Sequence, residues 1–149
     1  MPERARPAIN CFIAPHRFLS NFWPSRVSLD AITYPTVEHA YQAAKTVHPE
    51  ERARIAVAGQ PGTAKQLGRT VTIRRDWHEV KLPVMLGLLR QKFAREPLHG
   101  QLLATGDAPL IEGNGWGDTF WGVCCGVGEN HLGRLLMQVR DEIRKEMSL

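Results

Sequence analysis

The sequence predicts one compact α+β domain that is mostly helical and carries a small antiparallel sheet. Apolar residues recur at near-helical spacing in several segments, and the clearest stripe covers positions 132 to 143. Strand-like runs are few and short. A hydrophobic content of 43% over 149 residues supplies one ordinary core and is too little for two comfortable domains. We therefore expect a single domain over residues 1–149.

The elements at the start of the chain are short. Residues 1–8 are rich in proline and arginine and are expected to fray. Cys11 to Ile13 predicts a short strand, and the two strand-like runs on either side of Asp30 predict a hairpin. The aromatic segment from Phe18 to Pro24 has a polar middle and ends in proline, which favours a loop.

Capping residues, glycines and prolines set the expected helix boundaries. Thr36 is a suitable N-cap for the first helix, and Pro49 stops it. Pro83 lies near the start of a longer helix, where a proline is tolerated. The helices expected are Val37 to about Val47, Glu50 to Ala58, Thr63 to Leu67, Asp76 to about Glu96, Leu98 to Thr105 and His131 to Met147. Further short strands are expected at Thr70 to Ile73 and Pro109 to Glu112.

Composition narrows the possible environments and ligands. No apolar stretch approaches the roughly 20 residues of a membrane span, and the first residues lack a signal core. Cys11, Cys124 and Cys125 form neither an even disulfide framework nor a Cys-x-x-Cys pair, which fits a reducing compartment, and we expect the cytoplasm. The six histidines show no metal-binding spacing, so neither a metal nor a cofactor is predicted. The net charge of +4 favours phosphates or nucleic acid without demanding either, because a merely soluble basic surface would look the same.

Three of the four tryptophans stand in polar or glycine-rich stretches. Trp77 lies between Asp76 and His78, and glycines flank Trp116 and follow Trp121. Glycine neighbours leave a flat ring reachable by a planar ligand, and Asp118 is close by. This pattern predicts a pocket for a base or a sugar; the alternative is that the rings are core residues.

The segment from Thr36 to Lys45 is the densest polar cluster on an expected helix. Glu38, Tyr41 or Gln42, and Lys45 fall on one face, so a carboxylate and an amine share a stripe. The alternative is that each charge only favours its own helix end. A group of cations that follows would hold a phosphate or simply be solvated. Its members are Lys65, Arg69, Arg74 and Arg75.

Several motifs together resemble the YbiA-like family, also called the NADAR domain family. The resemblance runs from about Phe12 to Arg140. It rests on these motifs, in chain order: Phe18-Leu-Ser-Asn-Phe-Trp-Pro, Tyr34-Pro-Thr-Val-Glu-His-Ala-Tyr-Gln-Ala-Ala-Lys45, Ala64-Lys65 with Gly68-Arg69, Asp76-Trp77 with Lys81, Lys92-Phe93, Leu102-Leu103-x-Thr105-Gly106, Asp118-x-Phe120-Trp121-Gly122 and Gly128-x-Asn130-x-Leu132-Gly133-Arg134-Leu135-Leu136-Met137.

The resemblance implies a mainly helical α+β fold and an N-glycosidase activity on ribosides. It implies that Glu38 and Asp118 are catalytic carboxylates and that Lys45 acts covalently in members that remove ADP-ribose. The expected substrate-binding residues are Asn21, Tyr41, Gln42, Arg69, Trp77 and Trp121. The chain departs from the family pattern at Val123-Cys124-Cys125-Gly126, where members commonly have a longer Gly- and Asp-containing turn.

Three functions remain open at this point. The expected reaction is removal of ADP-ribose from guanine in DNA, in the manner of an antitoxin. The first alternative is cleavage of phosphoribosyl intermediates of riboflavin synthesis, with release of ribose 5-phosphate. The second is a non-catalytic module that binds ADP-ribose. The expected partners are the ADP-ribosyl or phosphoribosyl nucleobase and ADP-ribosylated DNA, with no membrane; the oligomeric state is open.

Overall fold

Two compact units make up the computed structural model, which describes residues 5–149. The central unit is Asn21–Ala94, and the terminal unit combines the residues up to Ser20 with Arg95–Leu149. Each is described by itself. Half of the expected frayed segment, residues 1–4, lies outside the described residues. The prediction of a single domain stays a prediction.

A hairpin opens the central unit. Strands β1 (Pro24–Leu29) and β2 (Ile32–Thr36) pair in antiparallel fashion, as predicted. Asp30 and Ala31 form the turn with φ values of 48° and 67°, and two positive φ values are the mark of a type I′ turn. The loop expected from Phe18 to Pro24 is only partly correct. Arg17–Leu19, which belong to the terminal unit, form a short 3-10 helix (η1) that buries Phe18 and Leu19, and Pro24 already belongs to β1.

Helix α1 (Val37–Ala44) is the buried centre of this unit, and all eight of its residues are buried. The Thr36 side chain accepts a 3.1 Å hydrogen bond from the backbone of His39, which confirms the predicted N-cap. The helix ends three residues earlier than expected. The amides of Lys45 and Thr46 bond to carbonyls three residues back, so the last turn tightens and stops.

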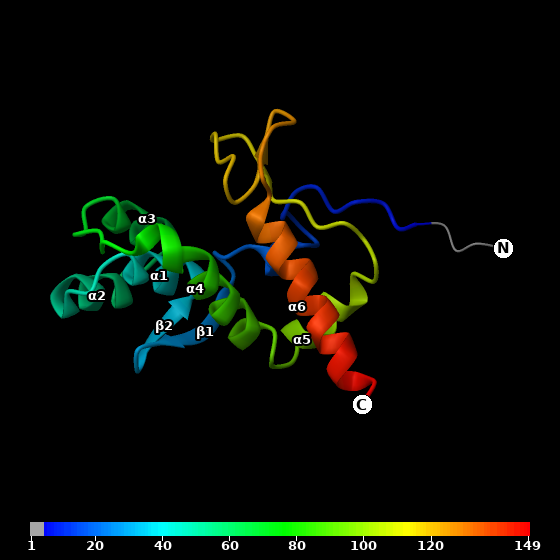
Figure 1. Ribbon diagram of the computed structural model, residues 1–149, viewed down its shortest axis with the longest axis horizontal. Coiled ribbons are helices and arrows are strands. Elements are labelled where there is room, and N and C mark those ends of the chain that lie inside the picture. Colours follow the sequence, from blue (N-terminus) through cyan, green and yellow to red (C-terminus); the bar gives the residue numbers. More distant parts are fainter. Residues whose placement is uncertain (1–4) are drawn as a thin grey trace. The chain divides into compact units, whose positions relative to one another are not determined.

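Three further helices pack against α1 (Figure 1). Their bounds are α2 (Pro49–Ala56), α3 (Pro61–Gly68) and α4 (Trp77–Lys92). Proline opens α2 and α3, where its missing amide costs nothing. The strand expected at Thr70 to Ile73 is wrong. The Thr72 amide donates to the Glu51 carboxylate at 2.7 Å, so no ladder forms there.

The terminal unit holds α5 (Leu98–Ala104), α6 (His131–Met147) and two short parallel strands, β3 (Gly113–Asn114) and β4 (Val123–Cys124). The strands expected at Cys11 to Ile13 and Pro109 to Glu112 are absent from the described residues, and an isolated bridge joins Ile9 to Leu110 instead. The bounds predicted for α6 are confirmed. Its buried stripe includes Leu132, Leu136, Val139 and Ile143.

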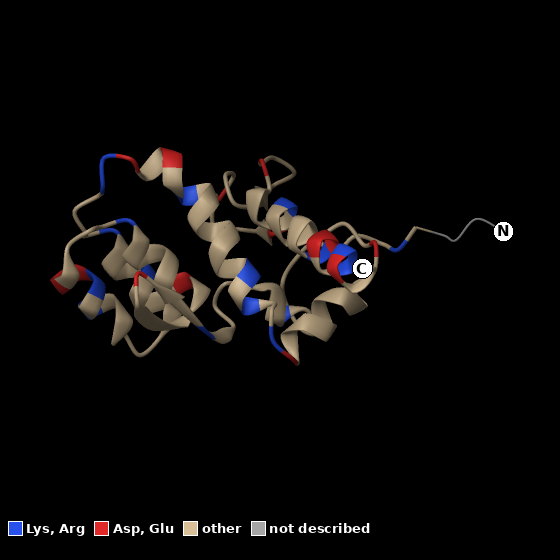
Figure 2. Ribbon diagram, turned by 60° about the horizontal axis from the view of Figure 1, so that its bottom comes forward, with Lys and Arg blue, Asp and Glu red and all other residues tan. Residues whose placement is uncertain are grey.

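Charged residues of both signs are mixed near the C-terminal end of α6 (Figure 2). The exposed pair Lys145 and Asp141 is an example, with 3.1 Å between its charged atoms. Within residues 5–149, no helix has the length and apolar character required to cross a membrane. Helices dominate and the sheet content is small, so the predicted α+β class is confirmed.

Candidate active site

Glu38 occupies the first turn of α1 and is only 7% exposed. Its amide donates a 3.1 Å hydrogen bond to the carbonyl of Asn21, and its Oε1 accepts one of 2.8 Å from Nε2 of Gln42. The positive end of a helix also favours a carboxylate at this position. The fold therefore holds this acid in a fixed, largely dry place.

Two buried amide oxygens lie on residues that bond to Glu38. Oδ1 of Asn21 and Oε1 of Gln42 have no hydrogen-bond partner among the described residues. Asn21 directs its Nδ2 to Sδ of Met85 at 3.7 Å, a weak contact. Gln42 packs against Gly68 of α3 so closely that a methyl group at position 68 would overlap its side chain. Gly68 is thus a supporting residue that was not among the predicted site residues, although it belongs to the Gly68-Arg69 motif of the family pattern.

Lys45 follows the last turn of α1 and is half-buried. Its Nζ lies 5.6 Å from the centroid of the Tyr41 ring. Burial lowers the pKa of Lys45, Glu38 opposes that change, and Arg69, Lys65 and Lys81 lower the pKa further. The expected carboxylate–amine stripe is therefore present, and burial makes the charged form of the amine less favourable than it is in an exposed lysine.

Trp77 and Tyr41 form an aromatic pair next to this lysine. Their ring centroids are 5.2 Å apart, with a tilt of 50°. Both side chains are less than a tenth exposed, so most of the Trp77 ring is covered, in contrast to the expected reachable surface. Its role as a pocket wall stays a prediction.

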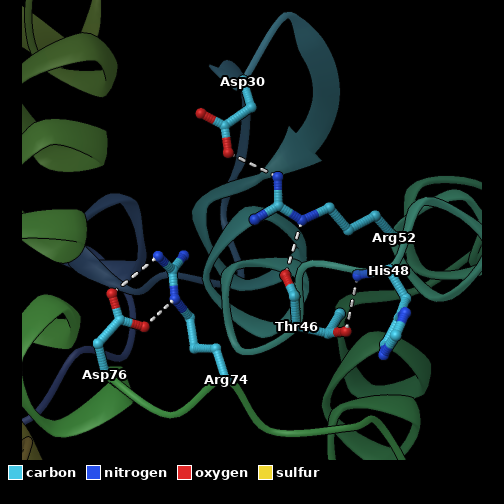
Figure 3. A network of polar contacts seen from close by, with 6 residues as sticks. All are labelled: Asp30, Thr46, His48, Arg52, Arg74 and Asp76. Carbon is cyan, nitrogen blue, oxygen red and sulfur yellow. Dashed lines mark hydrogen bonds and ion pairs between the residues drawn. The ribbon is translucent and has the colours of Figure 1, made fainter.

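Polar contacts fix the start of α4 beside the end of α1 (Figure 3). The amide of Arg74 donates to the carbonyl of Lys45 at 2.7 Å. The Arg74 guanidinium donates to both carboxylate oxygens of Asp76, at 2.6 and 3.1 Å. This ion pair raises the pKa of Arg74 and lowers that of Asp76. Arg74 is therefore engaged in holding the backbone before Trp77, which weakens its candidacy as a phosphate ligand.

A second network in Figure 3 ties α2 to the same region. The buried Arg52 donates to the carbonyl of Thr46 at 2.8 Å and to the Asp30 carboxylate at 2.6 Å. The Thr46 hydroxyl accepts from the amide of His48 at 3.1 Å. Arg52 therefore anchors the residues that follow Lys45 to α2 and links α2 in turn to Asp30 of the hairpin turn.

Asp118 lies in the terminal unit, where it organises a loop. Its Oδ1 accepts hydrogen bonds from the amides of Phe120 at 3.2 Å and Trp121 at 2.9 Å. Asn114 closes the loop from the other side, because it accepts from the Asp118 amide at 3.0 Å and donates to the Asp118 carbonyl at 2.9 Å. One carboxylate oxygen of Asp118 thus holds the backbone that presents Trp121.

Trp121 belongs to an aromatic cluster in that loop. Its half-buried ring meets Phe120 edge-on at 4.9 Å and lies 6.4 Å from the ring of His131. Trp116 is 65% exposed and Trp23 is 36% exposed. Glycine neighbours were expected to leave the rings of Trp116 and Trp121 reachable, and Trp116 is the more exposed of the two.

The predicted site residues fall into two groups. Four of them come together on or beside α1, namely Glu38, Tyr41, Gln42 and Lys45. In the described part of the chain, no group of three His, Cys, Asp or Glu is arranged to hold a metal. The members of the central unit are Asn21, Glu38, Tyr41, Gln42, Lys45, Arg69 and Trp77. Asp118 and Trp121 form the second group, in the terminal unit.

Comparison with known proteins gives close relatives. An N-glycosidase of Nostoc punctiforme is 42% identical over 144 residues, which cover 91% of this chain and 90% of that protein. N-glycosidase YbiA of Escherichia coli is 39% identical over 133 residues, which cover 85% and 81%. Its NMR structure matches with a TM-score of 0.85 and 34% identity, over 96% of this chain and 88% of that one. The predicted fold and the N-glycosyl hydrolase class are confirmed.

A riboflavin biosynthesis protein of Vibrio vulnificus is also similar, with 38% identity over 134 residues. The match covers 87% of this chain but only 36% of that longer protein. The NADAR domain family matches residues 10–144, nearly the range over which the motifs suggested it. The chain belongs to the NADAR domain family.

Proposed function

We propose that this chain hydrolyses the N-glycosidic bond of a 5′-phosphorylated riboside, and that phosphoribosyl intermediates of riboflavin synthesis are its substrates. The name of the Vibrio vulnificus relative supports this pathway. Because the chain spans about a third of that protein, the support concerns the matched region alone. The products would be ribose 5-phosphate and the free base.

The charge pattern around Lys45 carries the proposal. Three cations, Arg69, Lys65 and Lys81, act on this lysine from the side of α3 and α4, while Glu38 acts on it from within α1. A phosphate group is stabilised by such a set of ammonium and guanidinium donors. The cations therefore suit the 5′-phosphate, and Glu38 suits the sugar.

Glu38 would act on the charge that develops during cleavage. When an N-glycosidic bond breaks, positive charge builds on C1′ and on the ring oxygen, so a nearby carboxylate stabilises the transition state more than the ground state. Glu38 is buried and fixed by Gln42, so little reorganisation is needed at that moment. The aromatic pair Tyr41 and Trp77 would keep water from the site.

Lys45 would supply the nucleophile. Burial lowers its pKa, so more of its amine is neutral near pH 7 than in an exposed lysine. Attack on C1′ would expel the base and give a ring-opened Schiff base, which water would hydrolyse to the sugar and the free amine. The alternative role for Lys45 is that of a phosphate anchor or a partner of Glu38.

The deciding experiment offers two substrates separately: a phosphoribosyl riboflavin intermediate, and DNA that carries ADP-ribosyl-guanine. Mass spectrometry then quantifies released ribose 5-phosphate and ADP-ribose. We expect cleavage of the first, with turnover about 10²–10³-fold lower in Glu38→Gln. Glu50→Gln is the matched control, because Glu50 also lies in the first turn of an eight-residue helix but is exposed. Cleavage of neither substrate, or near-normal turnover in Glu38→Gln, refutes the proposal.

Borohydride separates the two roles of Lys45. Reduction during turnover should leave the sugar phosphate covalently attached to wild-type protein, and Lys45→Arg should gain no such mass. The exposed Lys145 provides the control, since Lys145→Arg should be trapped like wild type. A wild-type enzyme that turns over substrate and is never trapped would leave Lys45 as a phosphate anchor.

The second candidate substrate is ADP-ribosyl-guanine in DNA. The net charge of +4 and the sequence pI of about 9.3 favour a polyanion, which is the observation in its support. Cleavage of the DNA substrate that falls steeply as salt is raised would favour it over the riboflavin intermediate. A tight complex with uncleaved ADP-ribosylated ligand would instead favour the non-catalytic module. The cytoplasmic location stays a prediction.

A further inference from the structure

Two adjacent cysteines stand at the tip that follows Trp121, and the proposed reaction uses neither. The Sγ atoms of Cys124 and Cys125 lie 3.9 Å apart. Cys125 is exposed and Cys124 is half-buried, so a small reagent has access to the pair. The pair also lies in the segment where the chain departs from the pattern of its family.

A closed, hydrogen-bonded turn carries the two thiols. The amide of Cys124 donates to the carbonyl of Val127 at 2.8 Å, and the amide of Val127 donates back at 3.0 Å. Cys125 and Gly126 between them have φ values of 53° and 77°, the left-handed conformation that both central residues of a type I′ turn require. The hydrogen-bonded turn therefore fixes the backbone from which both thiols extend.

This separation suits a bridging atom better than a disulfide. Adjacent Cα atoms are about 3.8 Å apart across a trans peptide, below the roughly 4.4–6.8 Å that disulfides span. A centre that binds two sulfurs and one carbon pyramidally holds the sulfurs somewhat closer together than a tetrahedral metal does. The two thiols, now 3.9 Å apart, reach that spacing by a small rotation of their side chains, without movement of the backbone.

The pKa of the Cys125 thiol also favours a ligand that bridges the two sulfurs. The hydrogen bond from Cys124, followed by the charge of Cys124, raises the pKa of the Cys125 thiol. A raised pKa reduces the thiolate fraction and so disfavours attack on peroxides. A reagent that accepts both thiol protons suits such a pair better. In addition, no third His, Cys, Asp or Glu of the described chain completes a metal site there. The bound centre would therefore receive only two bonds from the protein, both from sulfur.

We propose that Cys124 and Cys125 form a dithiol site for an arsenic(III) centre that carries one organic substituent. Two S–H bonds and the arsenic–oxygen bond break, two arsenic–sulfur bonds form, and the oxygen leaves as water with both thiol protons. No electrons are transferred, so no oxidant or reductant is needed. The site is independent of the proposed hydrolysis, and its test requires no riboside.

Phenylarsine oxide is the probe, and intact-mass spectrometry is the measurement. We expect one adduct per chain, heavier by a phenylarsenic unit less two hydrogens. Excess 2-mercaptoethanol should leave the adduct in place, and 2,3-dimercaptopropanol should remove it, because only a second dithiol competes with a chelate. Cys124→Ser and Cys125→Ser should each lose the stable adduct.

Cys11 provides the matched control. It is a half-buried cysteine of the same unit whose Cβ lies near Gly113 of β3, so Cys11→Ser should bind the probe like wild type. Circular dichroism checks that each serine variant is folded. A wild-type protein with no adduct, an adduct that 2-mercaptoethanol removes, or a stable adduct in either Cys124→Ser or Cys125→Ser overturns the proposal. Loss of binding in Cys11→Ser also overturns it, because it would move the site away from the turn.

Discussion

Nε2 of Gln42 donates a 2.8 Å hydrogen bond to Oε1 of Glu38, one turn earlier in α1, and both side chains are more than nine-tenths buried. A buried carboxylate has lost most of its hydration, so it depends on such a donor. The same residue types meet again in α6, where Gln138 donates to Glu142 at 3.0 Å on the exposed surface. The two pairs allow the effect of burial to be separated from that of the hydrogen bond itself.

Replacing Gln42 with methionine should lower kcat about tenfold to a hundredfold, because a hydrogen bond to a charged group contributes about 1.5–3 kcal/mol. If Gln42 acts through Glu38, KM should change little; a raised KM would indicate direct contact with substrate. Gln138→Met removes the equivalent donor from the surface pair and should leave both constants unchanged. Steady-state kinetics on the cleaved riboside make the comparison, and wild-type kcat in Gln42→Met would contradict it.

Gly68→Ala should weaken the same arrangement from the side of α3. The added methyl group would overlap the Gln42 side chain, so we expect the free energy of unfolding to fall by about 1–3 kcal/mol and turnover to fall with it. Gly62 lies on the same helix with open space around its Cβ position. Gly62→Ala should therefore be neutral or stabilise by up to about 1 kcal/mol. Urea unfolding measures both, and equal stability of the two variants would argue against the close contact.

Local chemistry made α1 predictable from the sequence. Thr36 caps the helix through its own side chain, and the face expected to carry Glu38 and Lys45 forms as the helical period requires. The sequence left open whether Tyr41 or Gln42 shares this face with the two charges. In the structure both do, because Gln42 bonds to Glu38 and the Tyr41 ring lies beside Lys45. Contacts three or four residues apart in a helix are visible in the sequence pattern.

Contacts between distant segments were not predictable in this way. The strand expected at Thr70 to Ile73 failed because the Thr72 amide bonds to Glu51, 21 residues away. The importance of Gly68 depends on how closely α3 approaches α1. Such pairings follow from how the elements pack, and a single sequence carries no periodic signal for them.

Lys92 should make stability depend on pH. Its side chain is 1% exposed, and burial lowers its pKa from 10.5 to about 7. Between those values the unfolded chain binds a proton that the folded chain does not. The contribution of Lys92 to the free energy of unfolding is therefore greatest above about pH 10.5, decreases as the pH falls towards about 7, and is constant below that.

Lys92→Met should remove this slope and raise the free energy of unfolding near pH 8, where wild type bears most of the cost. Urea unfolding at about pH 6, 8 and 10 measures it. Lys145→Met is the control, because Lys145 is 78% exposed and its removal should leave the slope intact. Parallel pH profiles for wild type and Lys92→Met would show that Lys92 keeps its proton in the folded protein.

The Asp118 side chain has two properties that mutation can separate, its negative charge and its role as a hydrogen-bond acceptor. Its Oδ1 accepts from the amides of Phe120 and Trp121, an arrangement typical of the turns that aspartate and asparagine both form. Asp118→Asn keeps an oxygen in that place, whereas Asp118→Ala leaves two backbone donors without it. We expect Asp118→Ala to lose about 1–3 kcal/mol of unfolding free energy and Asp118→Asn to lose less, as measured by urea unfolding.

Turnover of the same two variants then assigns the role of Asp118. A stable Asp118→Asn protein with little activity would support the catalytic carboxylate predicted from the sequence. If Asp118→Asn turns over like wild type while Asp118→Ala does not, the side chain serves to hold the loop of Trp121, because the amide preserves the acceptor and removes the charge. Equal stability of the two variants would contradict the hydrogen-bonding role, since only the alanine variant lacks the acceptor.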